Sequence, residues 1–285
     1  MRELGYSQSE AQKFIARKRV FVDGILVEKD KEEIFGEVEF ITFEPITRGL
    51  KPTYETDEFV LFDKPTGVLI HPQNRYTPYS LIDEVKYQFG KDANIAHRID
   101  LETSGLVLCA KNKESERDIK IMFQERDMKK KYLAMVKGKL ENEITCKEPL
   151  KVNKDEKSGI LRSIVRVDPH GKSSETFIKP LNYYDELNMT LVECYPHTGR
   201  QHQIRVHLFH VKHPIVGDPL YGVEDWITTK YLDKELSKEE RLNLIGSSRL
   251  LLHADELYFE YKNIKYNVKS KVNFIKECFD SLKIR

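Results

Sequence analysis

Long apolar runs are missing from the sequence, which argues against a membrane-spanning helix. No stretch of the 285 residues approaches the roughly 20 apolar residues that are needed to cross a bilayer. The N-terminal segment MRELGYSQSE also lacks the apolar region of a signal peptide, so we do not expect export. A hydrophobic content of 40% with 33% charged residues is typical of an ordinary folded protein rather than a disordered one.

Cysteine is scarce, and its positions show no paired ligand motif. The chain has four, which are Cys109, Cys146, Cys194 and Cys278. Cys109 lies within an apolar run, where a buried reduced thiol is expected. This usage predicts a reducing, cytoplasmic compartment. The sequence also lacks a Gly-x-Gly-x-x-Gly motif and a phosphate-loop lysine motif, which argues against the usual nucleotide cofactors.

A global excess of charge is missing too, because the formal net charge is only +1. A balanced total can hide local patches, however. Residues 1–22 contain five Lys or Arg residues and two acids, whereas residues 23–44 contain two lysines and eight acids. The sign of the charge therefore reverses within one short stretch at the start of the chain.

Residues 7–19 are predicted to form a helix that ends in three cations. Ser7 followed by Glu10 is a capping-box pattern, and apolar residues recur behind it at helical spacing. The cations are Arg17, Lys18 and Arg19. The helix dipole favours one or two cations at a helix end, so a solvated helix end explains part of this cluster.

A tight hairpin follows this helix, and a linker follows the hairpin. The segment VFVDGILVE places two apolar, β-branched runs around Asp23-Gly24, which is a strong hairpin signal. Residues 45–53 contain proline and glycine without periodicity and are predicted to be a linker. The sequence thus predicts a small N-terminal α/β unit, residues 1–45, and a larger domain, residues 46–285.

The larger domain is predicted to mix strands and helices without a regular alternation. The expected elements are strand–turn–strand at 58–72, a helix at 77–90 behind Thr77-Pro78, a strand at 105–110 that is apolar on both faces, a helix at 113–126, a strand at 130–138 and antiparallel strands at 161–167, 174–180 and 189–195. A mixed, mainly antiparallel sheet with helices packed on it, of the α+β class, fits this order best.

Two segments are dense in charged or titratable residues. His97 to Asn112 reads HRIDLETSGLVLCAKN, which places Arg98 and Asp100 at the start of a buried strand. The residues alone leave two interpretations open. The segment is either a surface loop before a core strand, or it holds a carboxylate at the sheet edge for chemistry.

The second segment, residues 197–222, is rich in His and Arg. A metal site built from its histidines is disfavoured, because no pair lies four residues apart beside an acid and because two arginines would repel a cation. Apolar residues at helical spacing instead predict a helix on the core, with the histidines packed locally. Arg200 and Arg205 are expected to project from its exposed edge, where guanidinium groups suit a phosphate or a paired carboxylate.

Two stretches within these segments, HRIDLETSGLVLCAK (97–111) and HTGRQHQIRVHL (197–208), resemble the signature motifs of the RluA-type pseudouridine synthase family. Further matches occur in the family's order over residues 57–260, and they are DKPTGVLIHP (63–72), KKYLAMVKG (130–138), HPIVGDPLYG (213–222) and RLLLHADELYF (249–259). The first 45 residues resemble the small αL-type RNA-binding module that is often fused to these enzymes. We expect this module to be shortened, since the chain begins where its usual first helix would be ending.

The resemblance implies an isomerase that converts uridines of RNA to pseudouridine without a metal or an organic cofactor. Asp100 is implied as the nucleophile, because covalent capture divides one difficult step into two. Arg205 is implied as the cation that keeps Asp100 ionised, Tyr132 as the aromatic that stacks on the uracil and acts in proton transfer, and Arg98 as the residue that fills the space of the extruded base. The other implied RNA-binding residues are His97, Arg200, Leu251 or Leu252 as an apolar wall, and Arg17, Lys18 and Arg19.

Each role has a simpler rival. Tyr132 could belong to the core, Lys64 could be a surface charge, and Lys129 to Lys131 could be a solvated strand start. A glycosidase would pair Asp100 with Glu102, although residues two apart rarely flank a substrate from both sides. A non-catalytic RNA-binding or ribosome-assembly protein is the more serious alternative.

The sequence does not fix the RNA substrate, because RNA recognition is spread over the surface. The N-terminal module favours large-subunit ribosomal RNA, and transfer RNA is the alternative. We expect a monomer.

Overall fold

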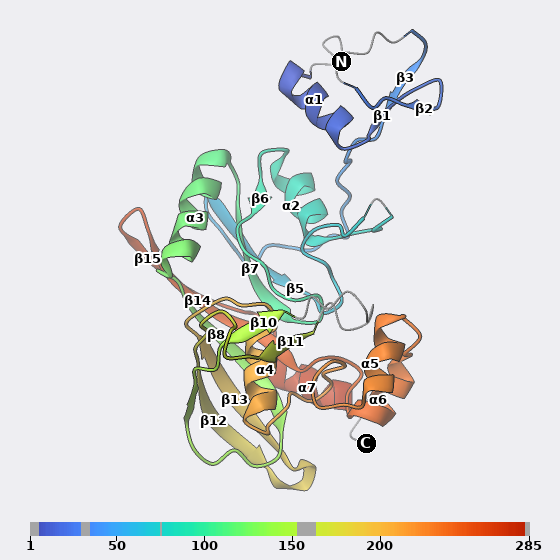
Figure 1. Cartoon of the computed structure of the whole chain (residues 1–285). Helices are drawn as coiled ribbons and strands as arrows, with labels where there is room; N and C mark the ends of the chain where they lie inside the picture. Colours follow the sequence, from blue (N-terminus) through green and yellow to red (C-terminus); the bar gives the residue numbers. More distant parts are fainter. Residues whose placement is uncertain (1–5, 30–34, 75, 153–163, 283–285) are drawn as a thin grey trace. The chain divides into compact units, whose positions relative to one another are not determined.

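The computed structural model describes residues 6–29, 35–74, 76–152 and 164–282, and its chain divides into two compact units, Met1–Pro45 and Ile46–Arg285 (Figure 1). The first unit contains a helix and a three-stranded sheet. The second contains the large sheet and the remaining helices. None of the helices in the described ranges is long and apolar enough to cross a membrane.

The N-terminal unit contains the helix and the hairpin that its sequence predicts. Helix α1 (Gln8–Ala16) starts with the capping box of Ser7 and Glu10. Strands β1 (Val20–Val22), β2 (Ile25–Leu26) and β3 (Val38–Phe40) form an antiparallel sheet in the order β2-β1-β3. The turn residues Asp23 and Gly24 both have positive φ (48° and 77°), as a two-residue hairpin of the preferred twist requires.

The second unit is built on a ten-stranded, mainly antiparallel sheet. Its strands are β4 (Tyr54–Glu55), β5 (Phe59–Lys64), β6 (Asn94–Ile95), β7 (Ser104–Ala110), β8 (Lys129–Lys137), β9 (Ile144–Cys146), β12 (Thr176–Tyr184), β13 (Met189–Pro196), β14 (Leu252–Tyr261) and β15 (Ile264–Lys269). The order is β4-β5-β7-β14-β8-β13-β12-β9, with β6 beside β7 and β15 beside β14. Only β7 and β14 pair in parallel among these strands. The expected mixed sheet is confirmed.

Helices pack on both faces of this sheet. The helices of this unit are α2 (Leu81–Phe89), α3 (Lys113–Glu125), α4 (Gln203–His210), α5 (Asp225–Leu232), α6 (Lys238–Ile245) and α7 (Phe274–Leu282), of which α2 and α3 lie on opposite faces of the sheet. In β7, Leu106 and Leu108 pack with Ile119 of α3, whereas Val107 and Cys109 pack on the α2 side. Because successive strand residues point to opposite faces, the part of β7 between these helices must be apolar on both faces, as the sequence indicates for residues 105–110.

Two predicted elements differ from the structure. Residues 68–72 do not form a full strand and make only the isolated bridge between Leu69 and Ser80. Helix α2 begins at Leu81 rather than behind Thr77-Pro78, because Ser80 forms the capping box with Asp83 while the Thr77 side chain binds the turn at Gln73.

The predicted strand at 161–167 corresponds to β11 (Val165–Val167), which pairs with β10 (Leu150–Val152). Residues 161–163 lie outside the described ranges.

The predicted linker at 45–53 is irregular, but most of it is not free. The Thr47 hydroxyl and the Arg48 amide both donate to the Glu84 carboxylate of α2, at 2.5 and 2.9 Å. Leu50 packs against the apolar cluster beneath the same helix. Residues 46–53 therefore belong structurally to the second unit.

Candidate active site

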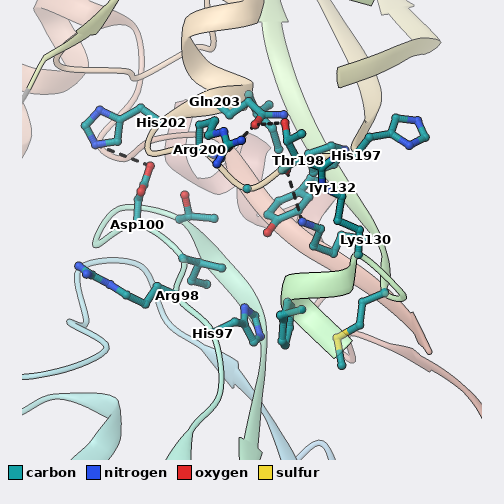
Figure 2. A pocket seen from close by; sticks show the side chains of 18 of the residues that line it. His97, Arg98, Asp100, Lys130, Tyr132, His197, Thr198, Arg200, His202 and Gln203 are labelled. Carbon is teal, nitrogen blue, oxygen red and sulfur yellow. Dashed lines mark hydrogen bonds and ion pairs between the residues drawn. The ribbon is translucent and has the colours of Figure 1, made fainter. Parts of the chain in front are cut away.

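A pocket of about 500 Å³ opens where the start of β7, strand β8 and the segment before α4 meet. Figure 2 shows Asp100 on one side of this pocket and Tyr132 on the other. The charged side chains that line it are five cations and one carboxylate, namely Arg98, Arg126, Lys130, Arg200, Arg205 and Asp100. This excess of positive charge makes the pocket suited to an anionic ligand.

The loop that carries Asp100 is held by the close approach of β7 to β14. A side chain at Gly105 would place its Cβ 2.2 Å from the Ala254 carbonyl oxygen, so only glycine fits there. Ser104 beside it contacts Nδ1 of the buried His253 at 2.8 Å. The Ser-Gly pair of the motif thus fixes the strand that begins four residues after Asp100.

The opposite side of the same loop is held by Lys64 at the end of β5. Its side chain is 1% exposed, and its Nζ donates to the carbonyl oxygens of Pro65, Val68 and Leu101. Burial lowers the pKa of Lys64 to about 7, while the charges of Asp100 and Glu102 oppose that shift. The interpretation of Lys64 as a surface charge is therefore wrong, since Lys64 is buried and its hydrogen bonds hold the loop that carries Asp100.

Glu102 points away from the pocket and binds the segment that contains α5 and α6. Its carboxylate accepts hydrogen bonds from Tyr231 at 2.9 Å and forms an ion pair with Arg241 at 2.8 Å. Because the Glu102 carboxylate is buried and bound to Tyr231 and Arg241, it does not face Asp100 across a substrate. The glycosidase alternative has no support in this geometry.

Arg205 lies in the first turn of α4 and is 3% exposed, so the expectation that it projects from the exposed edge of its helix is wrong. Its Nη1 donates to Asp100 Oδ2 at 3.2 Å. Its Nε and Nη2 donate to the two oxygens of Asp218 at 2.7 and 2.8 Å. Asp218 was not expected from the sequence, although it lies within the matched segment HPIVGDPLYG. This bidentate pair orients the guanidinium toward Asp100.

The segment before α4 is locked by Gln203. The Gln203 side chain accepts from the Thr198 hydroxyl and the Arg200 amide, and it donates to the Glu175 carbonyl oxygen and the Thr176 hydroxyl. Arg200 lines the pocket with its Nε bound to the Ser173 carbonyl oxygen at 3.0 Å. Gln203 thus explains how Thr198 and Arg200 are kept at the pocket wall.

His202 sits next to the carboxylate, which the sequence analysis did not anticipate. Its Nε2 lies 3.9 Å from Asp100 Oδ2 (Figure 2). Its Nδ1 contacts the Tyr221 hydroxyl at 2.8 Å. Burial and the Arg205 charge lower the pKa of His202 to about 4, so the ring is neutral at pH 7. The Tyr221 hydroxyl accepts from the Val165 amide and can donate to His202 Nδ1. The proton of the neutral ring then lies on Nε2, toward Asp100.

Tyr132 lies in the middle of the sheet, on β8, between its pairing partners Cys194 of β13 and Ala254 of β14. Its ring packs against the main apolar cluster and also lines the pocket. Burial raises the pKa of Tyr132 well above its ordinary value, and the Asp100 charge adds to this effect. Tyr132 is therefore a protonated phenol at neutral pH that combines a packing role with exposure to the pocket.

The lysines of β8 do not form a solvated strand start, apart from the exposed Lys129. The Lys131 ammonium lies 2.7 Å from Glu256 and 3.0 Å from Asp255. Lys130 lines the pocket and donates to the Thr198 carbonyl oxygen at 3.4 Å. Their common interpretation as surface charges is wrong for these two residues.

The remaining predicted site residues are divided between pocket and core. Arg98 is exposed at the rim of the pocket, and His197 and Leu252 also line it. His97 lines it as well, but its Nε2 accepts from the Leu108 amide and its ring stacks on Phe123 at 4.5 Å. Burial lowers the pKa of His97 to about 3. Leu251 is fully buried in the core and does not line the pocket.

Two of the other histidines of residues 197–222 pack as expected, whereas His210 is exposed. His207 is fully buried and bonds the side chains of Thr176 and Ser174, and His213 bonds the Lys137 carbonyl oxygen. Among the residues that the structure describes, no three His, Cys, Asp or Glu side chains are grouped to hold a metal ion. The four cysteines are buried, as predicted for Cys109. Arg17, Lys18 and Arg19 lie at the end of α1 in the N-terminal unit, and the first two are exposed.

The sequence of this chain matches a known protein family and several named relatives. The model of the family described as RNA pseudouridylate synthase matches residues 58–210, a range that includes Asp100, Tyr132 and Arg205. A Helicobacter pylori protein named an uncharacterized RNA pseudouridine synthase is 38% identical over 93% of this chain and 87% of its own length.

A more distant relative and a solved structure agree with these matches. The ribosomal large subunit pseudouridine synthase C of Buchnera aphidicola is 33% identical over 75% of this chain and 64% of its own length. The structure of human RNA pseudouridylate synthase domain containing 1 superimposes with a TM-score of 0.62 at 25% identity, over 81% of this chain and 86% of that one.

Proposed function

Since the chain belongs to the RNA pseudouridylate synthase family, we propose that it isomerises specific uridines of structured RNA with Asp100 as the nucleophile. The reaction class is that of an RNA pseudouridine synthase, an isomerase. It breaks the bond between C1′ of the ribose and N1 of the uracil, rotates the freed base and forms a bond between C1′ and C5. The proton leaves C5 and one is gained at N1, so nothing is added or lost overall.

One observation carries the assignment of Asp100. Its carboxylate is the only acid among the described residues that line the pocket, and Arg205 binds one of its oxygens at 3.2 Å. A guanidinium so close pairs with the carboxylate and fixes its direction in the pocket. An ionised carboxylate can attack either C1′ of the sugar or C6 of the ring, and in both cases covalent capture splits the reaction into two easier steps.

Tyr132 supplies a flat ring and a proton on the other side of the pocket. Because its pKa is held high by burial and by the charge of Asp100, it is a hydrogen-bond donor while Asp100 is free. Once Asp100 has formed a covalent bond, that negative charge is gone and the phenol loses part of what keeps it protonated. We infer that Tyr132 stacks on the uracil and takes part in proton transfer after the covalent step.

The large subunit of the ribosome is the proposed source of the substrate RNA. The Buchnera relative is named a ribosomal large subunit pseudouridine synthase, and transfer RNA is the alternative substrate. The test is to map pseudouridines in ribosomal and transfer RNA from a strain that lacks the gene, and to treat the corresponding unmodified transcripts with purified protein. Loss of one or more ribosomal pseudouridines, restored by the protein alone, is the expected result. A chain that binds these transcripts without converting uridine would instead be a non-catalytic RNA-binding protein.

Replacing Arg98 by Ala is expected to reduce activity more on structured RNA than on a short single-stranded oligonucleotide. Arg98 is exposed at the pocket rim, and a planar cation there can fill the gap that an extruded base leaves. Extrusion costs a few kcal/mol in a stacked substrate and little in a single strand. The measurement is single-turnover kcat/KM on both substrates. Equal losses on the two would exclude a role in base extrusion.

Deleting residues 1–45 is expected to weaken RNA binding and leave the chemical step intact. Arg17, Lys18 and Arg19 can neutralise about three phosphates, so the slope of log K against log salt should become shallower by roughly 2–3 at about 0.7–0.9 per contact. The truncated chain should start at Ile46, since Thr47 and Arg48 bind Glu84 of the second unit.

The matched control for this deletion is the full chain with Arg17, Lys18 and Arg19 changed to Gln. It should show the same change in salt slope if these cations are the contacts. The single-turnover rate at saturating enzyme should be unchanged in both proteins. A slower chemical step in a well-folded truncation would show that the N-terminal unit contributes to catalysis.

A further inference from the structure

Lys130 is half-buried and differs from Lys64 and Lys131 in having almost no partner. The Lys64 ammonium group donates hydrogen bonds to three carbonyl oxygens. The Lys131 ammonium group lies within 3.7 Å of each of three carboxylates. Lys130 has one long hydrogen bond of 3.4 Å, to the Thr198 carbonyl oxygen, as Figure 2 shows. No carboxylate within the described ranges forms an ion pair with it. Two of its three ammonium protons are therefore left for a ligand in the pocket.

The groups that face Lys130 add positive charge rather than neutralise it. Arg126, the residue that ends α3, lines the same pocket, as do Arg200 from the segment before α4 and the neutral His97 from the loop before β7. Tyr132 lies on the same strand two residues later. The acid of the pocket, Asp100, is already bound by Arg205. A desolvated cation with another cation beside it is unfavourable when the pocket is empty, and an anion relieves both costs.

From this arrangement we propose that Lys130 and Arg126 form a binding site for one phosphodiester of the RNA, next to the uridine that is converted. The proposal rests on the proposed function, in which the pocket takes an extruded nucleotide. In RNA the anionic groups are the phosphodiesters. Residues 130 and 132 point to the same side of β8, about 7 Å apart along the strand. A base that lies on Tyr132 thus has its own backbone within reach of Lys130.

The direct test removes the charge of the RNA and of the protein separately and together. A short RNA that contains the converted uridine is made with one neutral methylphosphonate in place of each phosphodiester around that uridine in turn. Binding and single-turnover conversion are measured for the wild type, Lys130→Met and Arg126→Met. At one position the methylphosphonate should weaken wild-type binding about tenfold, and Lys130→Met should lose a similar factor on normal RNA. At that position the two changes together should cost no more than either alone.

Lys129→Met is the matched control, because Lys129 is the exposed neighbour on the same strand. Its loss, if any, should add to that of the methylphosphonate at every position. Additive losses at every position for Lys130→Met as well would overturn the proposal. If the chain binds RNA without converting it, the same cycle is measured on binding alone, so that failure of catalysis and failure of this site are told apart. A chain that binds no RNA would overturn both.

The pH dependence gives a second readout that a structural lysine would not affect. Burial, with repulsion from Arg126, lowers the pKa of Lys130 to about 8, so the free enzyme carries this charge below pH 8 and loses it above. Wild-type kcat/KM should therefore fall as the pH rises through 8. Lys130→Arg keeps its charge in this range and should remove most of that fall. An unchanged profile in a folded Lys130→Arg protein that still converts RNA would contradict the assignment. Thermal unfolding of each variant shows whether it is folded.

Discussion

Asp100→Asn is expected to abolish pseudouridine formation, with a loss of at least about 10⁴-fold in the rate of the chemical step. Asn has nearly the same shape as Asp, but its amide is not a carboxylate nucleophile. The loop should keep its place, because Lys64, Thr66 and Gly67 hold it through the backbone carbonyls of Leu101 and Glu102 rather than through the Asp100 side chain. RNA binding should persist for the same reason. The measurement is single-turnover conversion together with the dissociation constant for the same RNA.

Two controls make this result interpretable. Asp92→Asn changes an exposed carboxylate eight residues earlier and should leave the rate unchanged. Mass spectrometry of the Asp100→Asn protein excludes Asp produced by deamidation. Turnover by a preparation shown to be free of Asp would eliminate Asp100 as the nucleophile, whatever its effect on binding.

The sequence was sufficient for those features that depend on local pattern or on contiguous motifs. The apolar run of β7 predicted a strand buried on both faces, and the capping box at Ser7 and the Asp23-Gly24 turn predicted the helix and hairpin. The motif segments also placed Asp100, Tyr132 and Arg205 in one pocket. Each of these predictions uses neighbours along the chain or a shared pattern.

Features that depend on contacts between distant residues were missed. Lys64 was interpreted as a surface charge, but its third acceptor is Leu101, 37 residues away. Asp218 went unassigned because only the fold of the segment after α4 brings it to Arg205. The start of α2 was misplaced because Ser80 and Thr77 are both acceptable caps. In the fold Ser80 bonds Asp83 and forms the bridge with Leu69, while Thr77 binds the turn at Gln73. The motifs therefore predicted which chemical role a charged residue could have, but not how deeply it is buried or which residues it contacts.

Replacing Arg205, which pairs with Asp218, is expected to reduce both stability and catalysis. Arg205→Met should lower the free energy of unfolding by about 3–5 kcal/mol, because it leaves a fully buried carboxylate without its cation. Asp218 has a side chain that is 1% exposed and keeps only the backbone amides of Leu220 and Tyr221 as donors. Activity should fall by on the order of 10²–10³-fold, as for other fixed groups that stabilise charge in an active site.

A double variant separates the two roles of Arg205. Arg205→Met combined with Asp218→Asn removes the stranded charge, so most of the lost stability should return in denaturant unfolding. The activity should not return, because Asp100 still lacks the guanidinium that lies 3.2 Å away in the wild type. If the double variant regains both, Arg205 serves only to neutralise Asp218, and the orientation of Asp100 must depend on another neighbour. His202 is then the residue to test first, since its Nε2 is 3.9 Å from the same carboxylate oxygen.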